Sequence, residues 1–170
     1  MSVSFLPDLI LPALTDLSAE LLKEKGIRFL MLDFDNTIVP YTCDEPTEAV
    51  EAWFRGMKES GITLCMVSNS KRDRVKRFCE AREIPCIRRA RKPFWWVGIR
   101  TALQQFAVLP EEAAIVGDQI FTDTLGGNGA GVTTVLVTPI NNHNIWLKLR
   151  HVAEQPFIQL AKRRIRHEKS

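Results

Sequence analysis

Short apolar runs alternate with amphipathic segments along this chain, and the alternation predicts its architecture. The apolar runs have the length of buried strands, and the segments between them have the periodicity of helices. The predicted strands are 29–32, 62–67, 85–87, 113–116 and 133–137, and the predicted helices are 46–60, 71–83, 94–106 and 120–130. Strands that alternate with helices predict an α/β fold: a doubly wound, mostly parallel sheet with helices on both faces.

The two ends of the chain have less regular patterns. Residues 7–25 have leucines on one side, which predicts a partly helical segment packed on the sheet rather than a membrane anchor. The tail has helical patterning that Pro156 is expected to break. Because 170 residues contain no repeat or linker, we expect a single domain, 1–170, with a basic helical tail at about 144–170.

Charge is strongly segregated, although the net charge is only +3. Residues 71–100 contain 11 basic and 3 acidic side chains, and residues 148–170 contain 7 basic and 2 acidic ones. Two basic stretches on a nearly neutral protein favour an anionic partner. For the tail alone, a solvated helix face is an equally good explanation.

The cysteines and the N-terminal residues indicate the compartment. Cys43, Cys65, Cys79 and Cys86 lack CxxC spacing, so we expect reduced thiols in a cytosolic-type compartment. The apolar stretch 5–14 lacks the basic start of a signal peptide and is shorter than the roughly 20 residues that span a bilayer. We therefore expect a soluble or peripheral protein.

Carboxylates follow the first predicted strand directly. Asp33 and Asp35 point the same way, because side chains alternate along a strand. Open α/β sheets bind their ligands at the carboxyl ends of strands. Burying two like charges there is costly unless cations compensate, so we expect a divalent metal and a lysine nearby.

Other predicted strands also end in distinctive polar residues. These are Ser68 and Asn69 after the second strand, Lys92 in the loop after the third, and Asp118 and Asp123 after the fourth. Together with D-F-D-N-T at 33–37 and G-D-Q-I-F-T-D at 117–123, they resemble the four motifs of the haloacid dehalogenase (HAD) superfamily of phosphotransferases. The resemblance implies that Asp33 is the nucleophile, which forms an aspartyl-phosphate, and that Asp35 is the general acid and base.

The resemblance also implies a Mg²⁺ cofactor, which prefers hard oxygen ligands. Its ligands would be the Asp33 carboxylate, the Asp35 main-chain carbonyl and the Asp118 carboxylate. Asp123 would be a further ligand through water or would anchor the others. Alternatively, Asp123 is an ordinary acidic residue at a helix N-terminus.

The same resemblance assigns the phosphate-binding residues. Ser68 and Asn69, just before a helix, would hold phosphate oxygens together with Thr37. Lys92 would supply a point charge for the phosphoryl oxygens and neutralise the nucleophile. A surface lysine is the alternative for Lys92, and the adjoining Pro93 argues against it because the family has a KP pair there.

Five longer segments of the chain together resemble one branch of HAD subclass III, the phosphatidylglycerophosphate (PGP) phosphatases. The matching segments are PDLILPALTDL at 7–17, LDFDNTIVPY at 32–41, VSNS at 67–70, ARKP at 90–93 and GDQIFTDTLGGNGAGVTTVLVTPI at 117–140. Within the last, Gln119, Gly126, Gly127 and Asn128 match, whereas Gly129 replaces a basic residue. The implied reaction removes the terminal phosphate of PGP to give phosphatidylglycerol.

The predicted elements leave no room for the cap domain that covers many HAD sites, and an open site suits a large or surface-bound substrate. Arg89 and Arg91 would meet phosphates, and Trp95 or Trp96 could lie at a lipid interface or in the core. We therefore expect a phospholipid substrate at an anionic membrane surface, and no nucleic-acid partner. The enzyme would be cytoplasmic and peripherally associated with the inner face of a membrane.

Two other interpretations remain open at this stage. The first is an HAD phosphatase of soluble sugar phosphates or of nucleic-acid 3′ ends. The second is a catalytically vestigial scaffold that binds an anionic partner. The intact set of Asp33, Asp35, Lys92 and Asp118 argues against the scaffold.

Overall fold

The computed structural model describes residues 4–68, 73–88, 96–141 and 145–168. The strands are β1 (Leu9–Leu11), β2 (Phe29–Leu32), β3 (Thr63–Ser68), β4 (Cys86–Arg88), β5 (Ala113–Gly117) and β6 (Thr133–Val137). The α-helices are α1 (Ala19–Glu24), α2 (Glu48–Glu59), α3 (Asp73–Ala81), α4 (Trp96–Phe106), α5 (Leu125–Ala130) and α6 (Ile145–Glu168). Shorter helical turns are η1 (Leu14–Asp16), η2 (Pro110–Glu112) and η3 (Ile120–Thr124), of which η3 is a π-helical turn.

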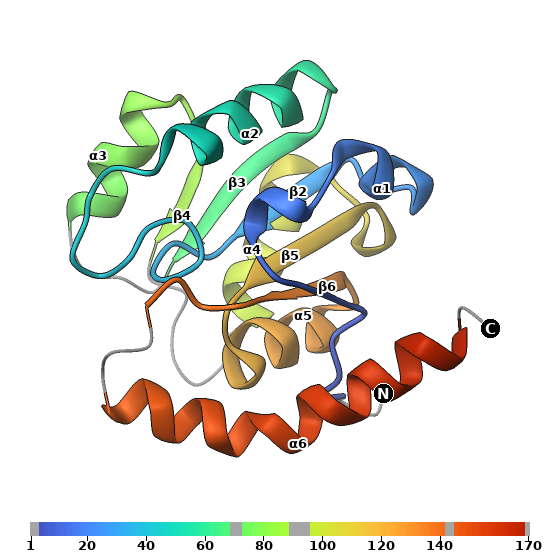
Figure 1. Cartoon of the computed structure of the whole chain (residues 1–170). Coiled ribbons are helices and arrows are strands. Elements are labelled where there is room, and N and C mark those ends of the chain that lie inside the picture. Colours follow the sequence, from blue (N-terminus) through green and yellow to red (C-terminus); the bar gives the residue numbers. More distant parts are fainter. Residues whose placement is uncertain (1–3, 69–72, 89–95, 142–144, 169–170) are drawn as a thin grey trace.

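The described strands form one parallel sheet in the order β1-β6-β5-β2-β3-β4, with helices on both faces (Figure 1). Each of the predicted strands and helices has a counterpart at nearly the predicted position. The predicted α/β fold is therefore confirmed. Among the described residues, no helix combines the length and the apolar character that crossing a bilayer requires.

Residues 7–25 contain a strand that the helical pattern did not predict. β1 lies at the edge of the sheet and pairs in parallel with β6, with Leu9 opposite Val135. The Asp8 carboxylate accepts hydrogen bonds from the Thr134 N–H (2.9 Å) and hydroxyl (3.0 Å), which fixes the register. Three apolar residues in a row are too few to show a period of two, so the strand has no clear sequence signal.

The prediction that Pro156 breaks the tail is wrong, because α6 continues through this residue. A proline inside a helix removes one backbone hydrogen bond and normally destabilises the helix. Here Glu154, Ile158 and Ala161, on both sides of the exposed proline, are buried against the rest of the protein. Tertiary packing thus holds the helix together at a position where local propensity disfavours it.

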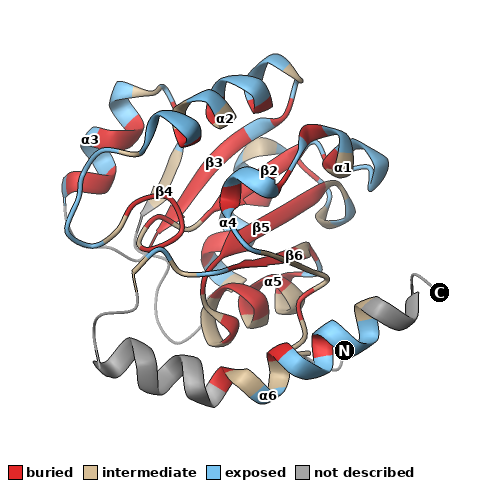
Figure 2. Cartoon of the chain, viewed as in Figure 1, coloured by how far each residue is buried: buried red, intermediate tan, exposed pale blue. Residues whose placement is uncertain are grey.

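Most residues of the central strands are buried (Figure 2). Their alternate side chains enter two separate cores. Leu30 and Leu32 of β2 pack on the face covered by α1, α2 and α3, and Phe29 and Met31 pack on the face covered by α4 and α5. Burial on both faces fixes the central strands and therefore the loops at their ends.

The strand order reverses at β2, and this reversal positions the site. The chain goes from β2 outward to β3 and β4, then returns to place β5 on the other side of β2. In open α/β sheets, ligands bind at such a switch point, outside the carboxyl ends of the strands. The ends of β2 and β5 are tied together there, since the Asp33 N–H donates to the Val116 carbonyl at 2.9 Å.

Candidate active site

The loop after β2 has a tightly constrained backbone. Asn36 has a left-handed conformation (φ 63°), which asparagine tolerates better than most residues. Its N–H donates to the Val39 carbonyl at 2.8 Å, and its carbonyl accepts from the Ile140 N–H at 3.0 Å. The Asn36 side-chain amide donates to the Asn141 carbonyl at 3.1 Å. These contacts, which link the loop to the chain after β6, fix the positions of Asp33 and Asp35.

Three carboxylates meet at the switch point. Asp33 follows β2, Asp118 follows β5, and Asp123 comes from η3; one oxygen of each lies within 4.8 Å of the others. Asp118 and Asp123 are buried, so the cluster differs from the exposed acidic groups that are common on protein surfaces. The structure thus brings together three residues that the sequence placed on different elements.

Asp123 reaches the cluster because Gly117 has no side chain. A Cβ at Gly117 would lie 2.0 Å from Asp123 Oδ2, so the carboxylate would have to move away. The same Oδ2 accepts the Gln119 N–H at 3.1 Å, and the Asp123 N–H donates to the Gln119 carbonyl at 2.9 Å. The π-helical turn therefore folds the Asp123 carboxylate back over the end of β5. This carboxylate both accepts a hydrogen bond within the turn and belongs to the cluster.

Burial and neighbouring charges raise the pKa of two carboxylates of the cluster, Asp33 and Asp123. Burial raises the pKa of Asp33 well above its usual range, and the charges of Asp123, Asp118 and Asp35 raise it further. Burial and the Asp118 charge also raise the pKa of Asp123 well above its usual range. An array of close, buried carboxylate oxygens with this much mutual repulsion fits a hard divalent cation such as Mg²⁺.

The Asp35 side chain is held by an arginine from another element. Asp35 Oδ1 lies 3.0 Å from Nη2 of Arg74, on α3, and both side chains are largely buried. The sequence gives no sign of this contact, because one arginine in a basic helix has no distinctive local signal. The sequence separation of Arg74 from Asp35 made the contact invisible before the fold was known.

Comparison with known proteins shows the family to which the chain belongs. The sequence model of the family "Mitochondrial PGP phosphatase" matches residues 2–141. The chain belongs to this family. It is also 38% identical, over 136 residues, to the probable phosphatase YqeG of Bacillus subtilis, covering 80% of this chain and 78% of that protein.

Solved structures of low sequence identity share the fold. The cobalt-bound deoxy-D-mannose-octulosonate 8-phosphate phosphatase of Haemophilus influenzae has a TM-score of 0.54 at 14% identity, covering 75% of this chain and 77% of its own. The phosphatase-domain part of the Bacteroides fragilis protein BF1531, complexed with Mg, has a TM-score of 0.51 at 19% identity, covering 66% of this chain and 36% of its own. The family membership and this fold identify the protein as a phosphatase of the HAD superfamily.

Two of the predicted phosphate-binding residues lie at the same edge of the sheet in this HAD phosphatase. Thr37 is buried, and its hydroxyl has no hydrogen-bond partner among the described residues. Ser68 is the last residue of β3, the neighbour of β2, and is buried as well.

The other predicted side chains at this site lie outside the described residues; they are Asn69, Arg89, Arg91, Lys92 and Trp95. Trp96, which was expected at a lipid interface or in the core, begins α4, is half-buried and packs against the core on the α4 side. A Cβ at Gly129 would contact its ring at 3.5 Å. The Trp96 ring thus occupies the space next to Gly129, the glycine that replaces a basic residue of the resembling family.

α6 contributes a buried carboxylate, Glu154, that no local sequence pattern marks. Glu154 Oε1 accepts the Ile120 N–H at 3.0 Å and the Phe121 N–H at 3.5 Å, at the start of η3. It therefore supports the turn that carries Asp123, and its charge contributes to the raised pKa of that residue. The two ends of the contact are 34 residues apart, so a sequence pattern could not reveal it.

A groove of about 460 Å³ adjoins the loop after β2. It is lined mainly by apolar side chains from the β1–η1 connection, the loop, the start of α2 and the chain after β6; Leu14, Thr37, Ile38, Val50 and Ile140 are among them. Ile140 is a large apolar residue that is half exposed. The groove and the carboxylate cluster thus lie on the same edge of the sheet and share one loop.

Proposed function

We propose that this HAD phosphatase removes the terminal phosphate of phosphatidylglycerophosphate in a Mg²⁺-dependent reaction. The observation that carries the proposal is the cluster of Asp33, Asp118 and Asp123, with oxygens within 4.8 Å of one another at the switch point. The family description supports this substrate. The proposal agrees with the substrate and cofactor expected from the sequence.

A residue of this chain can be assigned to each step of the reaction. Asp33 would attack phosphorus in line, and the bond from phosphorus to the glycerol oxygen would break, which leaves an aspartyl-phosphate. Asp35 would give its proton to the departing oxygen and would then take a proton from the water that hydrolyses the intermediate. Asp33, Asp118 and the Asp35 carbonyl would hold Mg²⁺, with Asp123 as a further support. When bound, the ion would offset the negative charge that the carboxylates and the phosphoryl group bring together.

The phosphoryl oxygens need donors and positive charge. Thr37 and Ser68, both buried at the carboxyl edge of the sheet, would provide hydroxyl groups, and Asn69 would provide an amide. Lys92, Arg89 and Arg91 would provide charge, as the resemblance implies. Phosphoryl transfer depends mostly on such positioning and electrostatic stabilisation.

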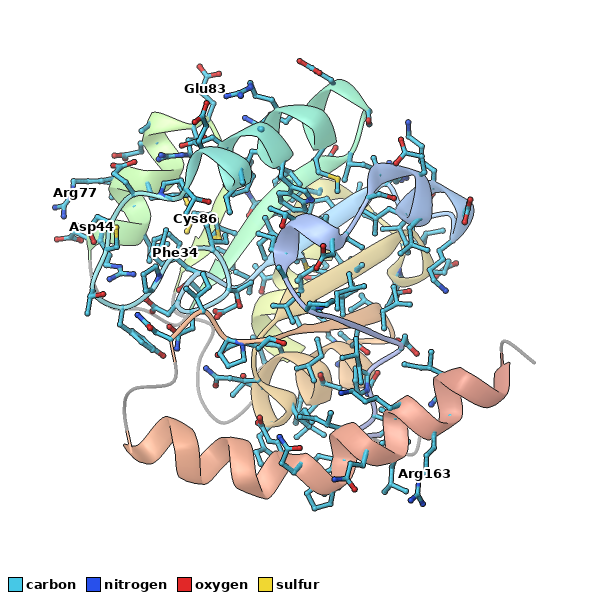
Figure 3. All side chains as sticks on the ribbon, in the orientation of Figure 1. Phe34, Asp44, Arg77, Glu83, Cys86 and Arg163 are labelled. Atoms are coloured by element: carbon cyan, nitrogen blue, oxygen red, sulfur yellow. The ribbon has the colours of Figure 1, made fainter. Side chains whose placement is uncertain are left out.

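A membrane surface would present this substrate. Lys162, Arg163 and Arg164 are exposed on α6, where the Arg163 side chain points away from the body of the protein (Figure 3). Each basic side chain near an anionic bilayer contributes about 1 kcal/mol of attraction. The apolar groove beside the catalytic loop suits a substrate with an apolar part better than a free sugar phosphate. We therefore propose a cytoplasmic enzyme that binds peripherally to the inner face of a membrane.

The experiment measures phosphate release from PGP in mixed micelles and from a panel of soluble phosphomonoesters, with Mg²⁺ and with EDTA. We expect strong preference for the lipid, loss of activity in EDTA, and loss of activity in Asp33→Asn. A preference for a soluble ester would retain the chemistry and overturn the substrate. Activity that survives Asp33→Asn would overturn the proposed mechanism.

A further inference from the structure

We infer that Arg74 is a positioning residue for Asp35: it fixes the carboxylate that exchanges the proton with the leaving oxygen. The inference rests on the proposed role of Asp35 and adds a residue to it. Its basis is the ion pair between Arg74 Nη2 and Asp35 Oδ1, 3.0 Å apart.

The guanidinium of Arg74 is anchored to the catalytic loop itself. Nη1 donates to the Tyr41 carbonyl at 2.7 Å, and Nη2 donates to the Pro40 carbonyl at 3.2 Å. The side chain is only 6% exposed, although it starts on α3 and has to reach across to the loop. The planar guanidinium of Arg74 thus links the backbone carbonyls of Pro40 and Tyr41 to the Asp35 carboxylate.

The ring of Phe34 restricts the guanidinium further. The Arg74 Cζ lies 4.9 Å from the centre of this ring, and Phe34 is completely buried between Asp33 and Asp35 in the sequence. Phe34 packs edge-on against Phe78 of α3, with ring centres 5.0 Å apart. Because a fork that is stacked and hydrogen-bonded loses little further freedom, it can hold a carboxylate in one orientation.

The burial of Arg74 separates this role from substrate binding. An arginine that binds phosphate has to present its donors to the site, whereas Nη1 and Nη2 of Arg74 face two loop carbonyls and Asp35 Oδ1, and its Nε is buried without a hydrogen-bond partner among the described residues. Asp44, the other acid near it, is 3.7 Å away and mostly exposed, so it contributes little to the orientation. Since Oδ1 of Asp35 faces the guanidinium, Oδ2 is the oxygen that we assign to proton transfer.

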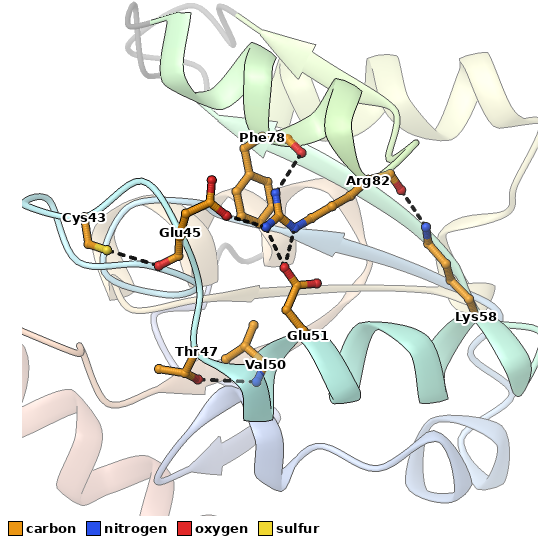
Figure 4. Close-up of polar contacts among 8 residues, drawn as sticks. All are labelled: Cys43, Glu45, Thr47, Val50, Glu51, Lys58, Phe78 and Arg82. Atoms are coloured by element: carbon orange, nitrogen blue, oxygen red, sulfur yellow. Dashed lines mark hydrogen bonds and ion pairs between the residues drawn. The ribbon is translucent and has the colours of Figure 1, made fainter.

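Arg82 provides a matched control. It follows α3, is also largely buried, pairs with Glu45 and Glu51, and stacks on the Phe78 ring at 4.0 Å (Figure 4). The contacts drawn there reach the connection from β2 to α2 only near its far end, at Cys43, Glu45 and Thr47, and none of them involves Asp35. Arg74 and Arg82 therefore both contact carboxylates and an aromatic ring. Of the two, Arg74 is the one that pairs with Asp35.

The test uses the dependence of kcat/KM on the leaving group, measured with the full chain. p-Nitrophenolate leaves without a proton, whereas the alkoxide of glycerol phosphate requires a general acid. Arg74→Gln should lower kcat/KM for glycerol phosphate about 10- to 100-fold and for p-nitrophenyl phosphate less than about threefold, because misplacing a catalytic group costs up to about 100-fold. Arg74→Lys should restore part of the loss, and Arg82→Gln should leave the ratio of the two substrates unchanged while lowering Tm.

A double-mutant cycle with Asp35→Asn gives a second measurement. If Arg74 acts through Asp35, adding Arg74→Gln to Asp35→Asn should cause no further loss of kcat/KM. Equal losses for both substrates in Arg74→Gln, or independent effects in the cycle, would overturn the inference and make Arg74 structural only. If Arg74→Gln does not fold, Arg74→Lys decides by the same ratio. Wild-type activity that survives Asp33→Asn would instead show that the proposed function has failed.

Discussion

Neutralising Asp33 should stabilise this protein in the absence of divalent metal while abolishing its activity. The Asp33 carboxylate lies within 4.8 Å of oxygens of Asp118 and Asp123, and its pKa is raised by burial and by these charges. Asp33→Asn keeps the shape of the side chain and removes the charge. The predicted consequence is a more stable protein without a nucleophile.

The structure gives the size of the effect. Two unit charges 4.8 Å apart repel by about 3.5 kcal/mol at an effective dielectric constant of about 20. Asp33→Asn removes two such repulsions, but protonation already relieves part of them in the wild type. We expect a gain of about 2–4 kcal/mol in the free energy of unfolding, or a rise in Tm of about 5–10 °C for a chain of this length.

The assay is thermal unfolding in EDTA and in Mg²⁺ at several pH values. In EDTA the gain should grow as the pH rises. The raised native pKa of Asp33 means that the folded state keeps a proton that the unfolded chain releases near pH 3.9, so wild-type stability is lost above that pH. Mg²⁺ at about 100 times its Kd should stabilise the wild type by about 2.7 kcal/mol and Asp33→Asn by much less.

Glu111→Gln is the control, because it neutralises an exposed acid away from the cluster and should change Tm very little. A lower Tm for Asp33→Asn in EDTA would refute the electrostatic reasoning. Equal stabilisation of both proteins by Mg²⁺ would refute the assignment of the metal to this cluster.

Three more predictions follow from the site and its surroundings. Gly117→Ala should reduce activity and metal-induced stabilisation, because its Cβ would displace the Asp123 carboxylate; overpacking of this kind costs about 1–3 kcal/mol, measurable by urea unfolding. Glu154→Ala should lower the free energy of unfolding by about 1–3 kcal/mol, since buried N–H groups lose their acceptor, and Glu154→Gln should cost less; equal losses would contradict the hydrogen-bonding role. Alkylation at neutral pH should label Cys43, which is exposed, long before Cys65, because burial raises the pKa of Cys65 to about 12; mass spectrometry after brief treatment would show the order.

The sequence by itself determined five of the six described strands of the sheet and most of the acidic site. Asp33, Asp35, Ser68 and Asp118 could be identified because each follows an apolar run, and the position of a residue after a strand is a local property. Parallel strands share a carboxyl edge, so these residues had to meet on one side of the sheet. Only the order of the strands, which depends on pairing between distant segments, decided that the ends of β2 and β5 are neighbours.

Other features were decided by tertiary structure alone. α6 passes through Pro156 because buried neighbours on both sides hold it in place, and β1 exists because β6 offers an edge for three apolar residues to join. Arg74 and Glu154 come from helices that contribute to the site only through packing, and their partners lie tens of residues away in the chain. Periodicity reports which face of an element is buried, but it contains no information about which distant group that face meets. For this reason the sequence specified the acids that would perform the chemistry, and the fold specified the groups that hold them in position.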